Sequence, residues 1–291
     1  MSLTAIPLVS KLSKNVIRIL GCNPSPMTLQ GTNTYLVGTG KRRVLIDSGD
    51  EETAKEYTKL LDEVLRNENA TIEHLVITHW HHDHVGGAGP VRDLLKSRKE
   101  SIPAIWKLPR SHDDGGAEEG GYNIEDWLTL EDEQSLEVEG ASLSVKYTPG
   151  HTSDHACLVL REDNVLFSGD CILGEGTAVF EDLKDYMSSL EKILAMGPKT
   201  IYPGHGPVIE DPAPKIKFYI QHRTKREADI MEVLKGHGSN SGMSEMDIVA
   251  RIYKDTPKNL WPAAAINVGH HLEKLVKEGK ARNENGLWYI V

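Results

Sequence analysis

The stretch from His79 to His84 holds four histidines and one aspartate within six residues. The short, β-branched run 74–78 before it predicts a buried strand, and the glycine pair 86–87 follows it. We therefore expect the stretch to form the loop at the carboxyl end of a strand, where α/β proteins place their chemistry. Imidazole nitrogens combined with a carboxylate oxygen are a ligand set that suits a zinc-like ion.

The spacing within this stretch favours two metal ions over one. In an extended segment His79 and His81 point the same way, whereas the adjacent side chains of Asp83 and His84 diverge and can serve a second ion. His82 stands between the two pairs, and we expect that it is not a ligand.

Three further candidate ligands, His151, Asp170 and His205, follow other strand-like runs. Each comes directly after a glycine, in the motifs Pro-Gly-His-Thr, Ser-Gly-Asp and Pro-Gly-His-Gly. The apolar runs that precede them cover 143–147, 156–160 continuing to 165–166, and 201–202. These side chains therefore also belong at strand ends, where they can join the first cluster.

In this order the motifs resemble the five-motif series of the metallo-β-lactamase superfamily. The series begins with Ile-Asp-Ser-Gly at 46–49, continues with the His-x-His-x-Asp-His stretch and ends with the three short motifs, so it covers about residues 15 to 210. The resemblance implies an α/β fold of the αββα type, in which two sheets face each other and helices cover both outer faces.

The resemblance also implies two zinc ions and assigns a ligand set to each. The first ion would be held by His79, His81 and His151, and the second by Asp83, His84 and His205. Asp170 would bridge the two ions. Asp47 would orient a ligand, because a ligating imidazole needs a partner for its other nitrogen.

Two ions held in this way would lower the pKa of a bridging water and leave a hydroxide to attack the substrate. Asp83 is then both a ligand and the best-placed catalytic proton acceptor. His155 and Tyr202 are candidates for the acid that protonates the leaving group, although each also suits a packing role. Asn33 is a tentative substrate-binding residue at the cleft edge. Thr32 beside it is a weaker candidate for the same role, and a turn-forming role is favoured for it.

The elements that must position these residues alternate between strands and helices. Apolar runs at 16–20, 35–37 and 44–46 indicate the first strands, and helices are expected over 52–67, 89–98 and 183–196. This alternation favours two sheets flanked by helices. The acidic, glycine-rich stretch 111–121, which includes His112, is expected to be a mobile loop.

At 291 residues the chain exceeds the usual size of one domain, so we expect a catalytic domain over 1–212 and a smaller one over 213–291. Ser-Glu-Met-Asp at 244–247 is typical of a capped helix start, and a longer helix should begin near Pro262 and end near Gly279. A hairpin is expected over 281–291. Helices followed by a hairpin resemble a winged-helix module, which binds nucleic acid or protein.

Charge is distributed unevenly between these parts. The chain carries a formal charge of −10, but 213–291 hold 13 Lys and Arg against 9 Asp and Glu. No acidic residue lies between Pro212 and Arg226, and Arg223, Lys225 and Arg226 fall along a helix-like stretch. The stretch is either a solvated helix face or a surface for a polyanion, and we take the three side chains as tentative substrate-binding residues.

Three functional hypotheses follow. Over nearly the whole chain, the sequence resembles a branch of the superfamily that includes a mitochondrial endoribonuclease, and the segments that carry this resemblance are 19–24, 27–35, 168–176 with 180–182, and 202–209. This resemblance implies zinc-dependent hydrolysis of single-stranded RNA. The alternative is a thioester or lactam hydrolase of the hydroxyacylglutathione hydrolase type, and the third hypothesis is a binding module with structural metals, which the number of intact ligands disfavours.

The cellular setting is indicated by composition. Three cysteines without Cys-x-x-Cys spacing favour reduced thiols, and Cys171 is interpreted as a core residue although it adjoins Asp170. No stretch approaches the ~18 apolar residues of a membrane span, so no membrane partner is expected. Basic residues precede the first acid, Asp47, as in a transit segment. The resemblance favours the mitochondrial matrix, with the cytosol as the alternative.

Overall fold

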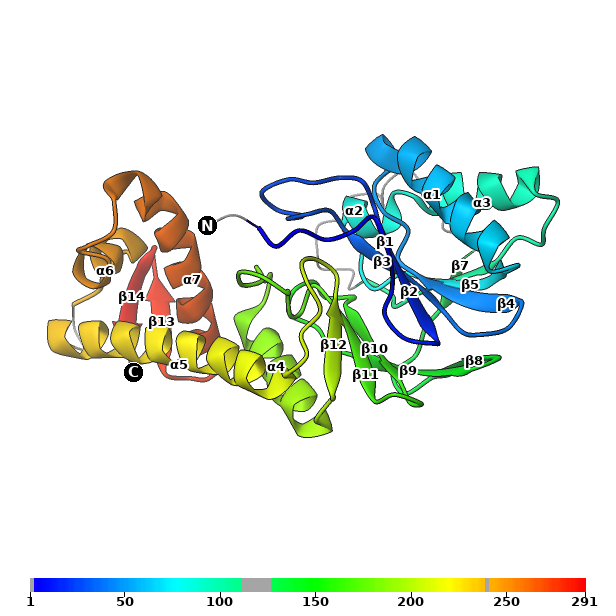
Figure 1. Ribbon diagram of the computed structural model, residues 1–291. Coiled ribbons are helices and arrows are strands. Elements are labelled where there is room, and N and C mark those ends of the chain that lie inside the picture. Colours follow the sequence, from blue (N-terminus) through cyan, green and yellow to red (C-terminus); the bar gives the residue numbers. More distant parts are fainter. Residues whose placement is uncertain (1–2, 111–126, 239–240) are drawn as a thin grey trace.

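A computed structural model describes residues 3–110, 127–238 and 241–291. The predicted loop 111–121, with His112, lies outside these residues. Two β-sheets face each other, and helices cover the outer face of each, as the sequence predicted (Figure 1). A smaller unit of helices and one hairpin follows at the C-terminal end.

The first sheet has seven strands in the order of the sequence. They are β1 (Val9–Lys11), β2 (Val16–Leu20), β3 (Asn33–Val37), β4 (Arg42–Ile46), β5 (Thr71–Val76), β6 (Ala104–Lys107) and β7 (Trp127–Thr129). β1 to β4 pair antiparallel, whereas β4 to β7 pair parallel. The connection from β4 to β5 passes through a 3-10 turn (Glu51–Thr53) and helix α1 (Ala54–Asn67), and the connection from β5 to β6 passes through helix α3 (Ala88–Ser97).

The second sheet has five strands in the order β12-β11-β10-β9-β8. They are β8 (Ser135–Val138), β9 (Ala141–Tyr147), β10 (Ala156–Leu160), β11 (Val165–Gly169) and β12 (Thr200–Pro203). Helix α4 (Leu183–Met196) connects the parallel pair β11 and β12, and the Asp182 side chain caps its first turn by accepting from the Asp185 N–H. Such a cap contributes about 1 kcal/mol.

Three apolar clusters hold these layers together. One lies between the sheets, where Val44 and Val76 of the first sheet belong to the same cluster as Val145 and Leu158 of the second. A second lies between the first sheet and the helices α1 and α3, and a third lies between the second sheet and the helices α4 and α5 (Pro212–His237). This arrangement is an αββα sandwich.

The strand directions bring the motif-bearing loops to one edge of the sandwich. β4 and β5 are parallel neighbours, so the residues after them, Asp47 and 78–84, emerge side by side. In the second sheet β11 and β12 run parallel, and the loop from β9 to β10 opens at the same end because β10 is antiparallel to both neighbours. Helix α2 (His82–Val85) is a single turn within the first of these loops.

The C-terminal unit contains the predicted helices and hairpin. They are α6 (Glu245–Ile252), a 3-10 turn (Lys258–Leu260), α7 (Trp261–Lys277), β13 (Ala281–Glu284) and β14 (Leu287–Ile290). The capping box at Ser244 and Asp247 is present as the sequence predicted. The unit has its own core, to which Val268, Leu272 and Trp288 contribute.

Helix α5 is shared by the two units. Its first half contributes Ile216 and Tyr219 to the core beneath the second sheet, whereas Ile230 and Leu234 of its second half belong to the C-terminal core. The predicted division at residue 212 therefore falls at the start of a helix that packs in both cores. Across the units, Lys277 of α7 pairs with Asp182.

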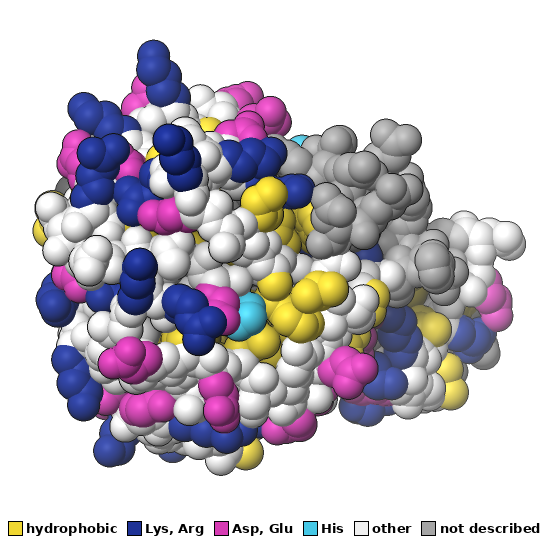
Figure 2. All heavy atoms as spheres, turned by 90° about the vertical axis from the view of Figure 1, so that its right-hand side faces the viewer, with side chains coloured by type: hydrophobic (Ala, Val, Ile, Leu, Met, Phe, Trp, Pro, Cys, Tyr) yellow, Lys and Arg dark blue, Asp and Glu magenta, His cyan; other side chains and the backbone are white. Residues whose placement is uncertain are grey.

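The surface of the sandwich that faces away from the C-terminal unit carries mixed charge. Figure 2 shows lysine and arginine side chains interspersed with aspartate and glutamate over this face. A mixed surface of this kind does not provide a field of one sign for a polyanion. No helix among the residues that the structure describes is long and apolar enough to cross a membrane.

Candidate metal centre

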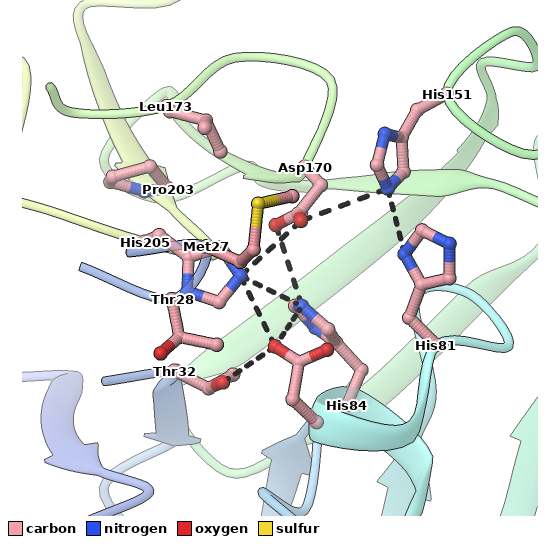
Figure 3. Close-up of polar contacts among 12 residues, drawn as sticks. Met27, Thr28, Thr32, His81, His84, His151, Asp170, Leu173, Pro203 and His205 are labelled. Atoms are coloured by element: carbon pink, nitrogen blue, oxygen red, sulfur yellow. Dashed lines mark hydrogen bonds and ion pairs between the residues drawn. The ribbon is translucent and has the colours of Figure 1, made fainter. Parts of the chain in front are cut away.

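Seven side chains from loops of the two sheets converge at the motif-bearing edge. Figure 3 shows His81, His84, His151, Asp170 and His205 pointing toward one another. The seven side chains form two groups, and within each group the potential ligand atoms lie within 4.8 Å of one another. The first group is His79, His81, His151 and Asp170, and the second is Asp83, His84 and His205. All seven were proposed as ligands from the sequence. His82 is exposed and belongs to neither group.

In the first group three imidazole nitrogens form a small triangle. His79 Nε2 lies 2.9 Å from His81 Nδ1 and 3.2 Å from His151 Nε2, and the third side is 3.1 Å. A tetrahedral ion with ligands at about 2.0–2.1 Å has neighbouring ligand atoms about 3.3 Å apart. The triangle therefore has nearly the size of one face of such a tetrahedron.

In two of the rings, a hydrogen bond to the nitrogen that points away from the centre fixes the tautomer. The other nitrogen then faces the centre without a proton. His151 donates its Nδ1 proton to the Val179 carbonyl at 2.8 Å, so its Nε2 is free to ligate. Thr78 Oγ1 donates to Asp47 and accepts from His79 Nδ1 at 3.0 Å, which leaves His79 Nε2 without a proton. Lone pairs that converge without protons between them suit a cation.

Asp47 performs the orienting role expected from the sequence. Its Oδ2 accepts from His84 Nδ1 at 2.8 Å and from the Thr78 hydroxyl at 3.0 Å, while Oδ1 accepts from the Thr78 N–H at 2.8 Å. The backbone of Asp47 has φ 60°, a left-handed conformation that Asp and Asn tolerate better than most residues. This conformation turns the side chain beneath both ligand loops.

Asp170 lies between the two groups. Its Oδ2 is 3.7 Å from His151 Nε2 and 3.2 Å from His205 Nε2, and its Oδ1 is 3.4 Å from His84 Nε2. Oδ1 is buried and, apart from this ion pair with His84, has no hydrogen-bond partner among the described residues, although a buried carboxylate oxygen normally has one. Gly204 lets the carboxylate approach, because a Cβ at that position would lie 2.3 Å from Oδ1.

These observations fit a metal centre with nitrogen and oxygen ligands. Without a cation, the same groups compete for protons. Burial lowers the pKa of His205, but Asp170 and Asp83 outweigh it and raise that pKa to about 9. Burial also lowers the pKa of His84, but the carboxylates of Asp83 and Asp170 raise it more, so the pKa ends well above its ordinary value. These two rings must therefore release protons before they can bind a metal ion.

The remaining histidines of the centre are held neutral in the metal-free protein. Burial lowers the pKa of His79 well below its ordinary value, and nearby imidazoles lower it further. Burial and His151 together lower the pKa of His81 to about 4. Neutral imidazole is the form that binds a metal ion.

Thr32, for which a turn-forming role was favoured over substrate binding, touches the centre. Its Oγ1 donates to Asp83 Oδ2 at 2.8 Å. Asn33, the residue that we proposed for substrate binding, is fully buried and donates from Nδ2 to the carbonyls of Pro203 and Gly206, both at 2.9 Å. Asn33 therefore fixes the loop of His205 and does not reach a substrate, because successive side chains of an extended segment point to opposite sides.

Arg223 is also placed differently from the sequence proposal. It is 5% exposed, its guanidinium lies about 5 Å from the rings of Phe180, Tyr186 and Tyr219, and it donates to the Ala178 carbonyl at 3.0 Å. It therefore supports the loop whose Val179 carbonyl holds His151, and it does not present its charge to solvent.

Lys225 and Arg226 do line an open cavity of 790 Å³ between α5 and α6. Lys225 is exposed, whereas Arg226 stacks on Tyr253 at 4.2 Å and lies 3.8 Å from Asp229. Arg251 also lines this cavity, as do the acidic residues Asp229 and Glu232. Three basic side chains therefore line it together with two acidic ones, and we call this the basic cavity. Lys225 and Arg226, two members of the proposed basic set, remain candidates for substrate contact.

Neither residue considered as a leaving-group acid is placed for that role. His155 is fully buried, and its Nε2 accepts from the backbone N–H of Asp170 at 3.1 Å. Burial lowers its pKa well below the ordinary value, so it is neutral and positions Asp170. Tyr202 packs between the sheets, stacked against Tyr35 at 5.7 Å. Cys171 is buried in the third apolar cluster, as interpreted from the sequence.

Sequence reasoning missed a buried ion pair beneath the His151 loop. Lys107 Nζ of β6 lies 2.5 Å from Asp154 Oδ2, and Asp154 Oδ1 accepts from Thr152 Oγ1 at 2.7 Å. Both charges are almost fully buried. The pair fastens the loop between β9 and β10 to the first sheet, and an Asp three residues after His151 was its only local signal.

Residues 27–205 match the sequence profile of the metallo-beta-lactamase superfamily, and residues 244–288 match a beta-lactamase associated winged helix domain. The chain belongs to the metallo-beta-lactamase superfamily. Its seven converging side chains and its αββα sandwich are therefore those of a family of metal-dependent hydrolases.

Relatives within the superfamily extend over almost the whole chain. Beta-lactamase-like protein 2 homolog of Drosophila melanogaster is 52% identical over 95% of this chain and 93% of its own length. The protein of the same name from Caenorhabditis elegans is 48% identical over 97% and 91%. Lactamase-like protein vrtG of Penicillium aethiopicum is 37% identical over 98% and 89%. The similarity thus includes the C-terminal unit.

Solved structures of the superfamily have the same fold. A metallo-beta-lactamase family protein from Thermus thermophilus matches 97% of this chain and 100% of its own with a TM-score of 0.71 at 20% identity. A beta-lactamase domain protein from Burkholderia ambifaria matches 97% and 93% with a TM-score of 0.75 at 18% identity.

Proposed function

We propose that the protein is an endoribonuclease that hydrolyses phosphodiester bonds of single-stranded RNA and uses two zinc ions. The observation that carries the hydrolytic part is the convergence of seven ligand atoms in two groups that share Asp170. The choice of RNA is supported by the full-length resemblance, by the winged-helix domain and by the basic cavity along α5. The identity of the metal as zinc and the number of two ions per chain are both parts of this proposal.

When bound, two such ions would supply an activated water and would stabilise negative charge on the phosphate. The residues of the chain provide the geometry. Asp47 and Val179 hold the ligand rings in their lone-pair orientation, and Asp170 spaces the two groups. Oδ2 of Asp83 accepts from Thr32 and lies 3.3 Å from His84 Nε2 and 3.2 Å from His205 Nε2. Oδ1 of Asp83 has no partner within the described part of the chain, and we assign the role of proton acceptor to it.

The first experiment is a cleavage assay with end-labelled single-stranded RNA, run in parallel with single-stranded DNA and with S-lactoylglutathione. The proposal predicts cleavage of RNA that Asp170→Ala abolishes. Hydrolysis of S-lactoylglutathione without cleavage of RNA would instead favour the thioester or lactam hydrolase, which the same ligand set can support.

The basic cavity can be tested separately through the salt dependence of binding. Replacing Lys225 and Arg226 by Ala should weaken single-stranded RNA binding and lower the log–log salt slope by ~0.7 for each phosphate that the variant no longer neutralises. Lys55 and Lys59 on helix α1 provide a control, because both are exposed and their replacement removes the same charge. Equal slopes for both variants would show that the cavity of α5 and α6 does not contact phosphates.

A mitochondrial location is part of the same proposal and follows from the resemblance. It can be tested by expressing the chain with a C-terminal fluorescent tag and scoring overlap with a matrix marker. Diffuse cytosolic fluorescence would favour the alternative.

A further inference from the structure

A cavity of 310 Å³ lies between the two units, beside the loop that holds His151. Residues 177–180 form one wall, and side chains of α5 and α7 form the others. Val179 belongs to this wall, and its carbonyl accepts the Nδ1 proton of His151. The cavity and the metal centre therefore share one loop.

Part of the lining is apolar and aromatic. Val179 is 56% exposed and Ile266 is 67% exposed, although both are large aliphatic side chains. The rings of Phe180 and His270 meet edge to face with centroids 5.4 Å apart. Exposed apolar side chains with a polar surround mark binding sites, and aromatic rings offer faces on which a planar ligand can stack.

The rest of the lining has hydrogen-bonding groups that the protein leaves unused. The Asn267 side chain has no hydrogen-bond partner within the described ranges. His271 is 1% exposed and Arg223 is 5% exposed, and His271 Nδ1 and Arg223 Nε are both buried without a partner. Buried polar groups are normally satisfied, so a cavity lined by such groups suits a ligand with both donors and acceptors.

The protonation state of His271 also suits a ligand with both donors and acceptors. Burial, followed by the charges of Arg223 and Arg226, lowers its pKa to about 3. The ring is therefore neutral near pH 7 and offers one donor and one acceptor nitrogen.

We propose that this cavity binds one nucleobase of a single-stranded RNA, next to the phosphodiester bond at the metal centre. A nucleobase has two flat apolar faces and an edge with donors and acceptors, and so it matches both parts of the lining. An acyl chain would leave Asn267 and His271 unpaired, and a phosphate alone would leave Val179 and Ile266 exposed. The volume lies at the lower end of the roughly 300–1,000 Å³ typical of small-ligand sites, which suits one nucleotide unit.

His222 lines both this cavity and the basic cavity that contains Lys225 and Arg226. A strand with one base in the first cavity would therefore continue toward basic side chains. The inference specifies how the proposed ribonuclease holds its substrate and rests on that proposed function.

The direct test is calorimetric titration of the zinc-loaded full chain with each of the four nucleoside 5′-monophosphates. We expect at least one to bind, and we expect Asn267→Leu, which keeps side-chain volume but removes the amide, to weaken that binding by about tenfold. Gln221→Leu is the control, because Gln221 is an exposed residue of α5 outside the cavity lining. If Asn267→Leu lowers thermal stability, Ile266→Ala replaces it, since most of the Ile266 side chain is exposed.

The second test uses labelled RNA in which a single abasic nucleotide is moved along the strand. At one position beside the cleaved bond the missing base should raise KM by about tenfold with little change in kcat, within the range that one stacked base contributes. In Asn267→Leu the same abasic nucleotide should cost much less, because the interaction with the base is already weakened.

The outcomes separate this inference from the proposed function. A protein that cleaves RNA, binds no mononucleotide and shows no abasic-sensitive position would overturn the nucleobase site alone. Mononucleotide binding that Asn267→Leu weakens, in a protein that cleaves no RNA, would support the site and overturn the ribonuclease. Binding that is equal in native protein and Asn267→Leu would place the ligand elsewhere and overturn the site.

Discussion

Asp47→Asn should weaken metal binding because an amide cannot accept all the hydrogen bonds that the Asp47 carboxylate accepts from His84 and Thr78. The carboxylate accepts three hydrogen bonds, from His84 Nδ1, the Thr78 hydroxyl and the Thr78 N–H. An asparagine side chain of the same shape can place only one oxygen. Its NH₂ group must then face either the Thr78 N–H or the His84 ring.

Each orientation has a defined cost. If the amide NH₂ faces His84, the ring accepts at Nδ1, its proton moves to Nε2, and the second group loses a ligand lone pair. If the NH₂ faces the Thr78 N–H, two buried donors oppose each other, which costs about 1–3 kcal/mol. The metal-free variant can adopt the first orientation, whereas metal binding by His84 forces the second, so this cost is subtracted from the binding free energy. The range corresponds to a loss of about 5- to 150-fold in affinity, consistent with the 10–100-fold typical of partners that orient metal ligands. Asparagine tolerates the φ of 60°, so the backbone should not move.

The assay is competition for zinc with a chromophoric chelator, with metal content measured after gel filtration and fold checked by circular dichroism. We expect the ion held by Asp83, His84 and His205 to be lost first. Asp50→Asn is the control, because Asp50 also accepts from a backbone N–H, that of Glu52, but touches no candidate ligand. Native zinc affinity at both sites of Asp47→Asn would refute the assigned hydrogen-bond roles.

Three further predictions follow from the same geometry. His151→Ala should abolish hydrolysis and leave the circular dichroism spectrum native, and a rate above about a tenth of native, worth ~1.4 kcal/mol of barrier, would exclude it as a ligand. Gly204→Ala should reduce metal content because its Cβ would lie 2.3 Å from Asp170 Oδ1, whereas Gly269→Ala in α7, with nothing within 4 Å, should bind metal normally and serve as the control. The shifted pKa values of His205 and His81 predict that the metal-free protein is most stable near pH 6.5 in chemical denaturation. The raised pKa of His205 contributes stability that is complete below about pH 6.5 and is lost as the pH rises through about 9, whereas the lowered pKa of His81, about 4, costs stability as the pH falls below 6.5. His84, whose pKa is also raised, keeps part of the alkaline decline, so a His205→Gln variant whose decline is as large as that of the native protein would contradict the assignment to His205.

The sequence was sufficient to predict elements and ligands because both follow local patterns. Apolar periodicity predicted helix α4 over 183–196 with the observed bounds, and the capping box at 244–247 predicted the start of α6. The run 156–160 that was expected to continue to 165–166 is instead two antiparallel strands, β10 and β11. The ligand residues follow strand ends in short motifs, and parallel strands bring such ends together. These features depend on neighbours in the chain rather than on distant contacts.

Side-chain direction was harder to predict because it depends on which face of an element meets the core. Thr32 and Asn33 are adjacent, so only one could reach the metal centre, and from the sequence we favoured Asn33. Arg223 had a usable signal that we did not apply. It falls on the stripe of α5 that contains Ile216, Tyr219 and Ile230, a spacing that places it on the buried face.

The contacts that fix the ligand rings lay beyond local patterns. The Val179 carbonyl that accepts from His151 is 28 residues away in the chain, and the loop that carries it is supported by Arg223. No motif spacing encodes a contact between a backbone carbonyl and a ring in a separate loop. Such contacts follow from the packing of α5 against α4 and the second sheet.

The most direct test of the proposed two-zinc ribonuclease is the rate of single-stranded RNA cleavage as zinc is added to protein stripped by a chelator. The seven ligand atoms in two groups predict little cleavage at one equivalent and a plateau near two equivalents per chain. Full cleavage at one equivalent would contradict the two-metal site, and no cleavage at any zinc content, with both equivalents bound, would contradict the assignment of RNA as substrate.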